Sequence, residues 1–191
     1  MAISLIKGQR ISLDKESGGS LNKVVMGLGW DPIKKKGFFS SKSASIDLDA
    51  SCCLFDENNI QVDIVYFGHL KSNDGSIIHT GDNLTGAGEG DDERIIVNLG
   101  NIPANIKNLV FTVNSFRGHT FNDVENAYCR LVDDRNQKEV ARYTLTGGGN
   151  HTGLIMTKLY RNQNEWKMQA IGEMVDGKTV HSLIPAITPF L

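Results

Sequence analysis

Short apolar runs alternate along the whole chain with clusters of Gly, Asn, Asp and Ser, and this alternation most constrains the fold. Runs of this length, bounded by turn residues and following one another closely, are typical of β-strands in a sandwich. The sequence therefore predicts an all-β protein, a β-sandwich of two mainly antiparallel sheets. The candidate strands are 3–6, 10–13, 23–30, 45–55, 60–67, 94–99, 107–114, 127–132, 138–145, 153–161 and 165–172.

The two-residue period of a strand is clearest in 45–55. Successive side chains of a strand point to opposite faces of its sheet, so this stretch predicts one apolar and one acidic face. The apolar face would hold Ile46, Leu48, Ala50, Cys52 and Leu54. The opposite face would hold Asp47, Asp49, Ser51 and Cys53.

One short helix is predicted at 121–127. Thr120 is placed to cap it, and Asp123 to reach back as in a capping box. Phe121, Val124 and Tyr128 would then share the inner face of the helix.

Composition limits the function more than it directs it. A chain of 191 residues fits a single domain, here 1–191, and its formal net charge of −2 argues against bulk attraction to nucleic acid or to an anionic membrane. The N-terminal apolar run is too short for a signal peptide, and the sequence contains no transmembrane stretch. Three cysteines, two of them adjacent, form no disulfide framework. A reducing cytoplasm is the expected location, with no direct membrane insertion.

The stretch 81–93 is the most informative about function. Five carboxylates fall between Asp82 and Glu93 with no basic residue among them, and four of the ten residues from Gly81 to Gly90 are glycine. Crowded carboxylates repel one another unless a cation lies between them. Many hard oxygen ligands on a flexible loop suit calcium better than magnesium or zinc. The spacing of the residues does not fit an EF-hand, because Leu84 and Gly86 stand where oxygen side chains are required.

Three further carboxylates are candidates for the same site. Asp47 and Asp49 lie on one face of a predicted strand, about 7 Å apart along the chain. Asp31 ends the apolar run 26–30, where a strand would meet a loop. The alternative is that Asp47 and Asp49 form only the solvent face of an amphipathic strand.

Several blocks of the sequence, in order, resemble the TerD family of tellurium-resistance and stress proteins. The first three are Gly27-Leu28-Gly29-Trp30-Asp31, Asp47-Leu48-Asp49-Ala50-Ser51 and the acidic stretch 81–93. The others are 70–76, 139–145 and 159–167. Together they extend the resemblance over about residues 3–172.

The resemblance implies a β-sandwich that binds two neighbouring calcium ions and has no enzyme activity. It also implies a location in the bacterial cytoplasm, at the periphery of the inner membrane, with other tellurite-resistance proteins and a TerC-type inner-membrane protein as partners. The ligands carried over from the family are Asp31, Asp47, Asp49, Asp82, Asn83, Glu89, Asp91, Asp92 and Glu93, with carbonyls from Gly86 and Gly88.

Two other functions stay open at this point. Clustered carboxylates also hold the metal ions of phosphoester hydrolases, and His79 is the one nearby candidate for a general acid or base. Alternatively, calcium is purely structural and only neutralises the loop. Residues 34–43 and 175–191 depart from the common family pattern, and the sequence assigns them no role.

Overall fold

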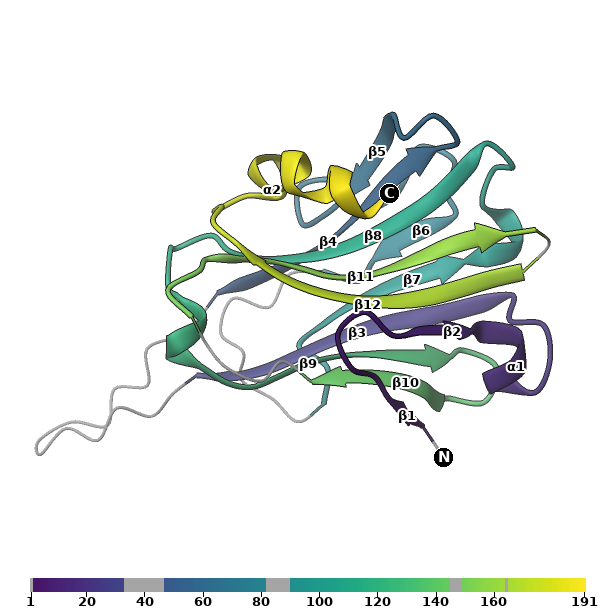
Figure 1. The fold of residues 1–191 in the computed structure, drawn as a ribbon, viewed down its shortest axis with the longest axis horizontal. Helices are drawn as coiled ribbons and strands as arrows, with labels where there is room; N and C mark the ends of the chain where they lie inside the picture. Colours follow the sequence, from purple (N-terminus) through teal and green to yellow (C-terminus); the bar gives the residue numbers. More distant parts are fainter. Residues whose placement is uncertain (1, 33–46, 82–89, 145–148, 164) are drawn as a thin grey trace, which may run out of the picture.

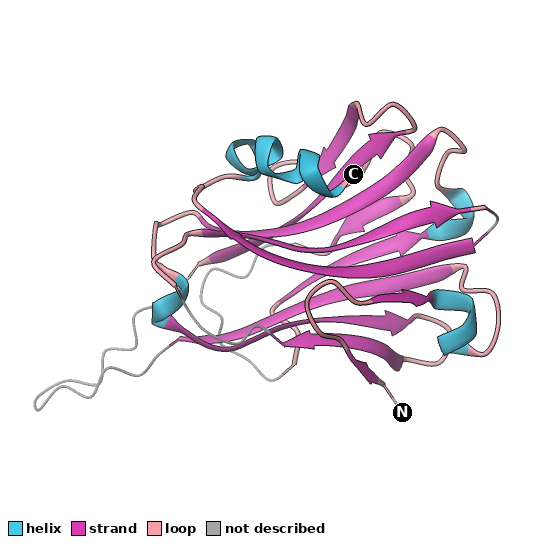
Figure 2. Cartoon of the chain, viewed as in Figure 1, coloured by secondary structure: helices cyan, strands magenta, loops and turns pink. Residues whose placement is uncertain are grey.

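The computed structural model describes residues 2–32, 47–81, 90–144, 149–163 and 165–191. Within those residues, twelve strands form two six-stranded sheets that pack face to face (Figures 1 and 2). The predicted all-β sandwich is therefore confirmed.

Sheet A has the strand order β1-β10-β9-β3-β7-β6. Its strands pair antiparallel except for β1, which runs parallel to β10 at the edge of the sheet. The bounds of its strands are β1 Ile3–Ser4, β3 Lys23–Pro32, β6 Ile77–His79, β7 Glu93–Asn98, β9 Val124–Asp133 and β10 Lys138–Thr144.

Sheet B has the order β2-β12-β11-β8-β4-β5 and is antiparallel throughout. The bounds of its strands are β2 Arg10–Ser12, β4 Leu48–Asp56, β5 Gln61–Val65, β8 Ile106–Ser115, β11 Gly153–Asn162 and β12 Glu165–Val175. Because β1 belongs to sheet A and β2 to sheet B, the first dozen residues join the two layers.

The main core fills the space between the sheets. From β4 it takes Leu48, Ala50, Cys52 and Leu54, four members of the apolar face that the two-residue period predicted. The fifth, Ile46, lies outside the described residues. The opposite face of β4 is also covered, because Cys53 and Phe55 belong to a second buried cluster on the outer side of sheet B.

The second cluster lies under the C-terminal helix α2, Val180–Ile187, which crosses the outside of sheet B (Figure 1). Val180 and Ile187 of this helix share the cluster with Ile155 and Ile171 of the sheet. The helix begins with a capping box, in which the Thr179 hydroxyl accepts the N–H of Ser182 and the Ser182 hydroxyl accepts the N–H of Thr179. The chain 175–191 thus serves to cover one face of the sandwich.

The prediction of a helix at 121–127 is wrong. Only Phe121–Asp123 form a single 3₁₀ turn, η2, and strand β9 begins at Val124. The Thr120 side chain makes no capping bond. Pairing with β3 outweighs the local helix signal, since Val124 and Glu125 lie opposite Pro32 and Asp31. The remaining short elements are α1 Leu13–Ser17, η1 Leu99–Asn101 and η3 Thr188–Phe190.

All three cysteines are free and buried. Burial raises the pKa of the Cys53 and Cys129 thiols to about 12 and raises that of Cys52 well above its usual value. In the described part of the chain, none of the helices has the length and apolar character needed to cross a membrane.

Candidate functional site

Three consecutive carboxylates, Asp91, Asp92 and Glu93, lie where β7 begins, and each has a different environment. Asp91 lies on the outer face of sheet A, Asp92 lies at a surface hollow, and Glu93 points between the two sheets. Three adjacent negative charges are thus distributed to different partners.

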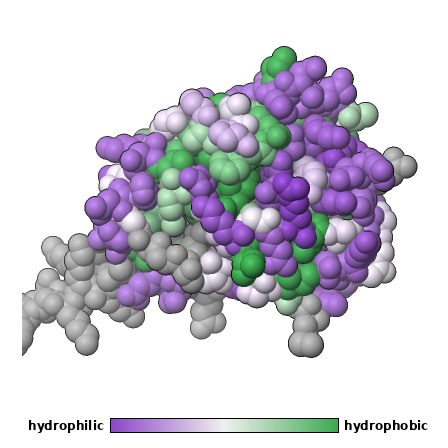
Figure 3. Space-filling model, in the orientation of Figure 1, coloured by the Kyte–Doolittle hydropathy of each residue, from purple (hydrophilic) through white to green (hydrophobic). Residues whose placement is uncertain are grey.

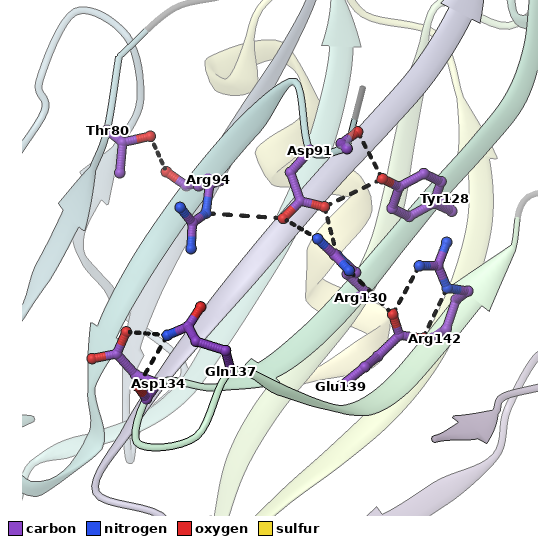
Figure 4. A network of polar contacts seen from close by, with 10 residues as sticks. Thr80, Asp91, Arg94, Tyr128, Arg130, Asp134, Gln137, Glu139 and Arg142 are labelled. Carbon is purple, nitrogen blue, oxygen red and sulfur yellow. Dashed lines mark hydrogen bonds and ion pairs between the residues drawn. The ribbon is translucent and has the colours of Figure 1, made fainter. Parts of the chain in front are cut away.

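Asp91 is held by a polar network on the outer face of sheet A (Figure 4). Its carboxylate accepts two hydrogen bonds from Arg130, at 2.7 Å from Nε and 3.1 Å from an Nη, and one from the Tyr128 hydroxyl at 3.3 Å. The network continues from Arg130 through Glu139 to Arg142. Only 4% of the Asp91 side chain is exposed. A carboxylate in a two-bond contact with a guanidinium is already neutralised by the protein.

Two glycines of the Gly27-Leu28-Gly29-Trp30 motif make room for this network. A Cβ atom on Gly27 would lie 2.3 Å from Oδ2 of Asp91, and one on Gly29 would lie 2.5 Å from the Tyr128 hydroxyl. Both distances are far below van der Waals contact, so only glycine allows Asp91 and Tyr128 to lie directly on β3.

Asp31 and Asp92 face a common surface hollow at the end of β3. The hollow has a volume of about 180 Å³ and is lined by Trp30, Asp31, Gly90, Asp92, Asn126 and Tyr128. Oδ2 of Asp92 accepts the Trp30 N–H at 2.9 Å, and Oδ2 of Asp31 accepts an Asn126 amide N–H at 2.8 Å. Burial, with the Asp31 and Asp91 charges adding to it, raises the pKa of Asp92.

Glu93 joins the two sheets inside the sandwich. Its Oε2 accepts the Ala50 N–H of β4 at 2.6 Å and lies 3.4 Å from Nε2 of His79. His79 is buried, and its Nδ1 accepts the Gly81 N–H at 3.1 Å. With Nδ1 accepting this hydrogen bond, Nε2 is the ring nitrogen that faces Glu93.

Asp47 and Asp49 are buried where β4 begins. Oδ2 of Asp47 accepts the Arg117 Nε–H at 3.2 Å, and Oδ2 of Asp49 accepts an amide N–H of Asn114 at 2.9 Å. Both are therefore more than the solvent face of a strand, which was the alternative to a ligand role.

The predicted ligands divide between described and undescribed residues. Asp82, Asn83, Gly86, Gly88 and Glu89 lie outside the described residues. Among the residues that are described, no three His, Cys, Asp or Glu side chains gather as a metal site. The structure does bring Asp31 and Asp92 to one hollow, and the two-ion site stays a prediction.

The sequence analysis missed the cationic partners of these carboxylates. Arg130 and Tyr128 alternate with buried residues along β9, so the two-residue period places both on the outer face of sheet A. Asn126 stands where β9 approaches Asp31. That alternation was readable from the sequence, whereas the side-by-side placement of β9, β3 and the start of β7 was not.

Residues 1–185 match the TerD domain family. The chain belongs to the TerD family. It is 50% identical over 184 residues to the tellurium resistance protein TerZ of Serratia marcescens, covering 95% of this chain and 94% of that protein. It is 42% identical to the stress response protein SCP2 of Bacillus subtilis (strain 168), covering 96% of this chain and 98% of the relative. The resemblance inferred from the motifs is confirmed.

Solved structures show the same TerD-like fold. The crystal structure of SAV2460, a protein of unknown function, superimposes with a TM-score of 0.72 at 21% identity, covering 86% of this chain and 95% of that one. A TerD homologue from Streptomyces coelicolor A3(2), SCO6318, superimposes with a TM-score of 0.66 at 19% identity, covering 86% and 96%.

Proposed function

We propose that this TerD-family chain is a calcium-binding module of a tellurium-resistance or stress-response assembly. It would act without enzymatic activity, through calcium-dependent contacts with protein or membrane-associated partners. The observation that carries the proposal is the convergence of Asp31 and Asp92 on one hollow that Gly90 also lines, within and beside the acidic stretch 81–93.

The chemistry of this hollow fits calcium. Its polar lining includes the two carboxylates and the amide of Asn126, and carboxylate and amide oxygens are the donors that calcium prefers. Asp31 and Asp92 would hold the ion directly. The further ligands it needs would come from Asp82, Asn83, Glu89 and the carbonyls of Gly86 and Gly88.

Asp91 and Glu93 would act differently from Asp92. The contact of Asp91 with Arg130 and that of Glu93 with the Ala50 N–H fix the chain on both sides of Asp92. Asp92 is thereby directed toward Asp31 before any ion arrives. Asp47 and Asp49 stay candidates for the second ion.

Binding through partners, rather than catalysis, is proposed because the hydrolase alternative gains no support. Its candidate acid or base, His79, is buried with Nδ1 accepting a backbone N–H and Nε2 facing Glu93. A general acid or base must reach the substrate or its attacking water. A TerC-type membrane protein and other tellurite-resistance proteins are the partners proposed.

Calorimetric titration of the chelator-stripped full chain with calcium, followed by magnesium, tests the proposal. We expect calcium-selective binding and a rise in melting temperature, since a ligand at a hundred times its Kd stabilises a protein by about 2.7 kcal/mol. Asp31→Asn and Asp92→Asn should each weaken one binding event at least tenfold. Asp176→Asn, at an exposed site, is the matched control.

Asp92→Asn also separates the effects of charge and calcium. Because the pKa of Asp92 is raised in the fold, its ionised form lowers stability at neutral pH when no cation is present. The variant should therefore melt higher than the wild type in chelator and gain less from calcium. Absence of binding heat from the wild type, or unchanged calcium affinity in both variants, would refute the proposal.

A further inference from the structure

A second pocket lies on the other side of the molecule from the Asp91 network, between α2 and the outer face of sheet B. Its volume is about 210 Å³. Its floor is formed by Ser51 of β4 and Asn114 of β8, one wall by Tyr66 and Phe67, and the other by 179–181 at the start of α2. Figure 3 shows pale and hydrophobic side chains gathered where α2 crosses the sheet, within a mostly hydrophilic surface.

The floor carries two polar atoms without hydrogen-bond partners. The Ser51 hydroxyl and Oδ1 of Asn114 are both buried and make no hydrogen bond, and each residue is 1% exposed. Buried polar groups are nearly always paired in native proteins, so an unpaired one that borders a pocket can be satisfied by a water or a ligand there. Two such atoms in one pocket are a stronger indication than one alone.

The orientation of Asn114 is fixed by its own contacts. Its amide nitrogen donates to Oδ2 of Asp49 and to the Lys178 carbonyl, both at 2.9 Å. The two amide hydrogens are thus used, which settles which end of the side chain is oxygen. Oδ1 is left as an acceptor, and the Ser51 hydroxyl beside it both donates and accepts.

The walls are aromatic and reach the surface. The Tyr66 ring lies 5.4 Å from the Phe67 ring and 5.6 Å from that of His181, in edge-to-face contacts. Phe67 also lies 6.1 Å from Phe116, and these two phenylalanines are 40% and 52% exposed. Exposed aromatic groups beside a pocket mark ligand sites more often than plain surface.

We propose that this pocket binds a small neutral molecule in which a planar ring carries a carboxamide-like edge. The ring would lie against the exposed sides of the Tyr66 and His181 rings, an N–H of the edge would donate to Oδ1 of Asn114, and its oxygen would accept from the Ser51 hydroxyl. The ligand is neutral because the lining carries no Asp, Glu, Lys or Arg side chain. It is of single-ring size because ligand pockets usually measure roughly 300–1,000 Å³, which is larger than this one.

The pocket is separate from the Asp31–Asp92 hollow, and the inference is tested with benzamide as the probe. Isotope-labelled full chain is titrated and followed by NMR. We expect saturable shifts confined to the pocket, including the side-chain amide of Asn114. Toluene lacks the polar edge and cyclohexanecarboxamide lacks the aromatic ring, so each should bind at least fivefold more weakly.

Two variants test the assigned contacts. Ser51→Ala removes the floor hydroxyl and should weaken benzamide binding at least fivefold. His181→Ala, at an exposed position of α2, removes one wall without disturbing the core and should weaken binding at least threefold. The matched control is Ser76→Ala, which removes another buried hydroxyl without a partner, at a position outside the pocket lining, and should leave binding unchanged.

The result that would overturn the proposal is equally definite. If benzamide causes no saturable shifts, or if both pocket variants bind it as the wild type does, the pocket holds only water. Because His181→Ala lies outside the packed sheets, this conclusion does not depend on Ser51→Ala folding.

Discussion

At the scale of single residues, the three neighbouring carboxylates have different structural roles. Asp91 is neutralised by Arg130, Asp92 lies at a hollow with Asp31, and Glu93 joins the two sheets through the Ala50 N–H. The sequence identified this stretch as special because its charge density is unusual. It could not separate the three roles, since these depend on which strands β7 meets in space.

Gly27→Ala tests how the Asp91 network depends on its glycine. The added Cβ would lie 2.3 Å from Oδ2 of Asp91, so Asp91 must move away from Arg130. We expect the free energy of unfolding to fall by about 1–3 kcal/mol, the usual range for overpacking, as measured by urea denaturation.

Gly100→Ala is the control for this change, because the nearest atom to its added Cβ is 3.7 Å away, an ordinary contact. It should leave stability within about 0.5 kcal/mol of the wild type, as most surface substitutions do. Equal effects of the two substitutions would mean that Asp91 is not held as described.

At the scale of elements, the sequence predicted strands better than helices. The period of β4 placed its apolar residues correctly, because alternation is a local property of the backbone. Helix α2 escaped prediction because Pro185 and several β-branched residues oppose a helix locally. Its docking on sheet B and the Thr179–Ser182 capping box outweigh that preference. The failed helix at 121–127 is the converse case, in which sheet pairing outweighs a capping signal.

Ile187→Ala tests whether α2 is held by the second cluster. Ile187 is fully buried, so its truncation should lower the free energy of unfolding by about 2–5 kcal/mol, as other buried Ile→Ala changes do. Ile184→Ala on the same helix removes the same atoms from a half-buried site and should cost clearly less. Chemical denaturation measures both, and similar small losses would mean that α2 contributes little to stability.

At the scale of the whole molecule, stability in acid depends on carboxylates whose pKa values are shifted in opposite directions. The Arg135 guanidinium lowers the pKa of Asp133, and that of Arg142 lowers the pKa of Glu139. Each carboxylate stabilises the fold above its unfolded pKa of about 4, and the contribution is lost as pH falls through the folded pKa. Asp92 has a raised pKa, so its ionised form destabilises the fold. Its protonation removes this destabilisation at a higher pH than that at which Asp133 and Glu139 are protonated.

In chelator, the free energy of unfolding should therefore fall steeply below about pH 4, where Asp133 and Glu139 become protonated. Urea denaturation across this range measures it. Asp133→Asn should flatten the acid limb, whereas Glu173→Gln, which removes an exposed ion pair with Lys7, should not. An acid limb unchanged in Asp133→Asn would exclude this origin.

Because all three thiols are buried, their chemical reactivity reports how often the sandwich opens. Only a thiolate reacts readily, and none forms easily in cysteines that are buried with raised pKa values. Their oxidation or alkylation therefore requires local or global unfolding of the chain. Cys53 lies beneath α2, whereas Cys52 and Cys129 lie between the sheets. Early reaction of Cys53 would thus indicate detachment of α2, whereas early reaction of Cys52 and Cys129 would indicate separation of the two sheets. Susceptibility to oxidants is then set by the opening equilibria of the fold.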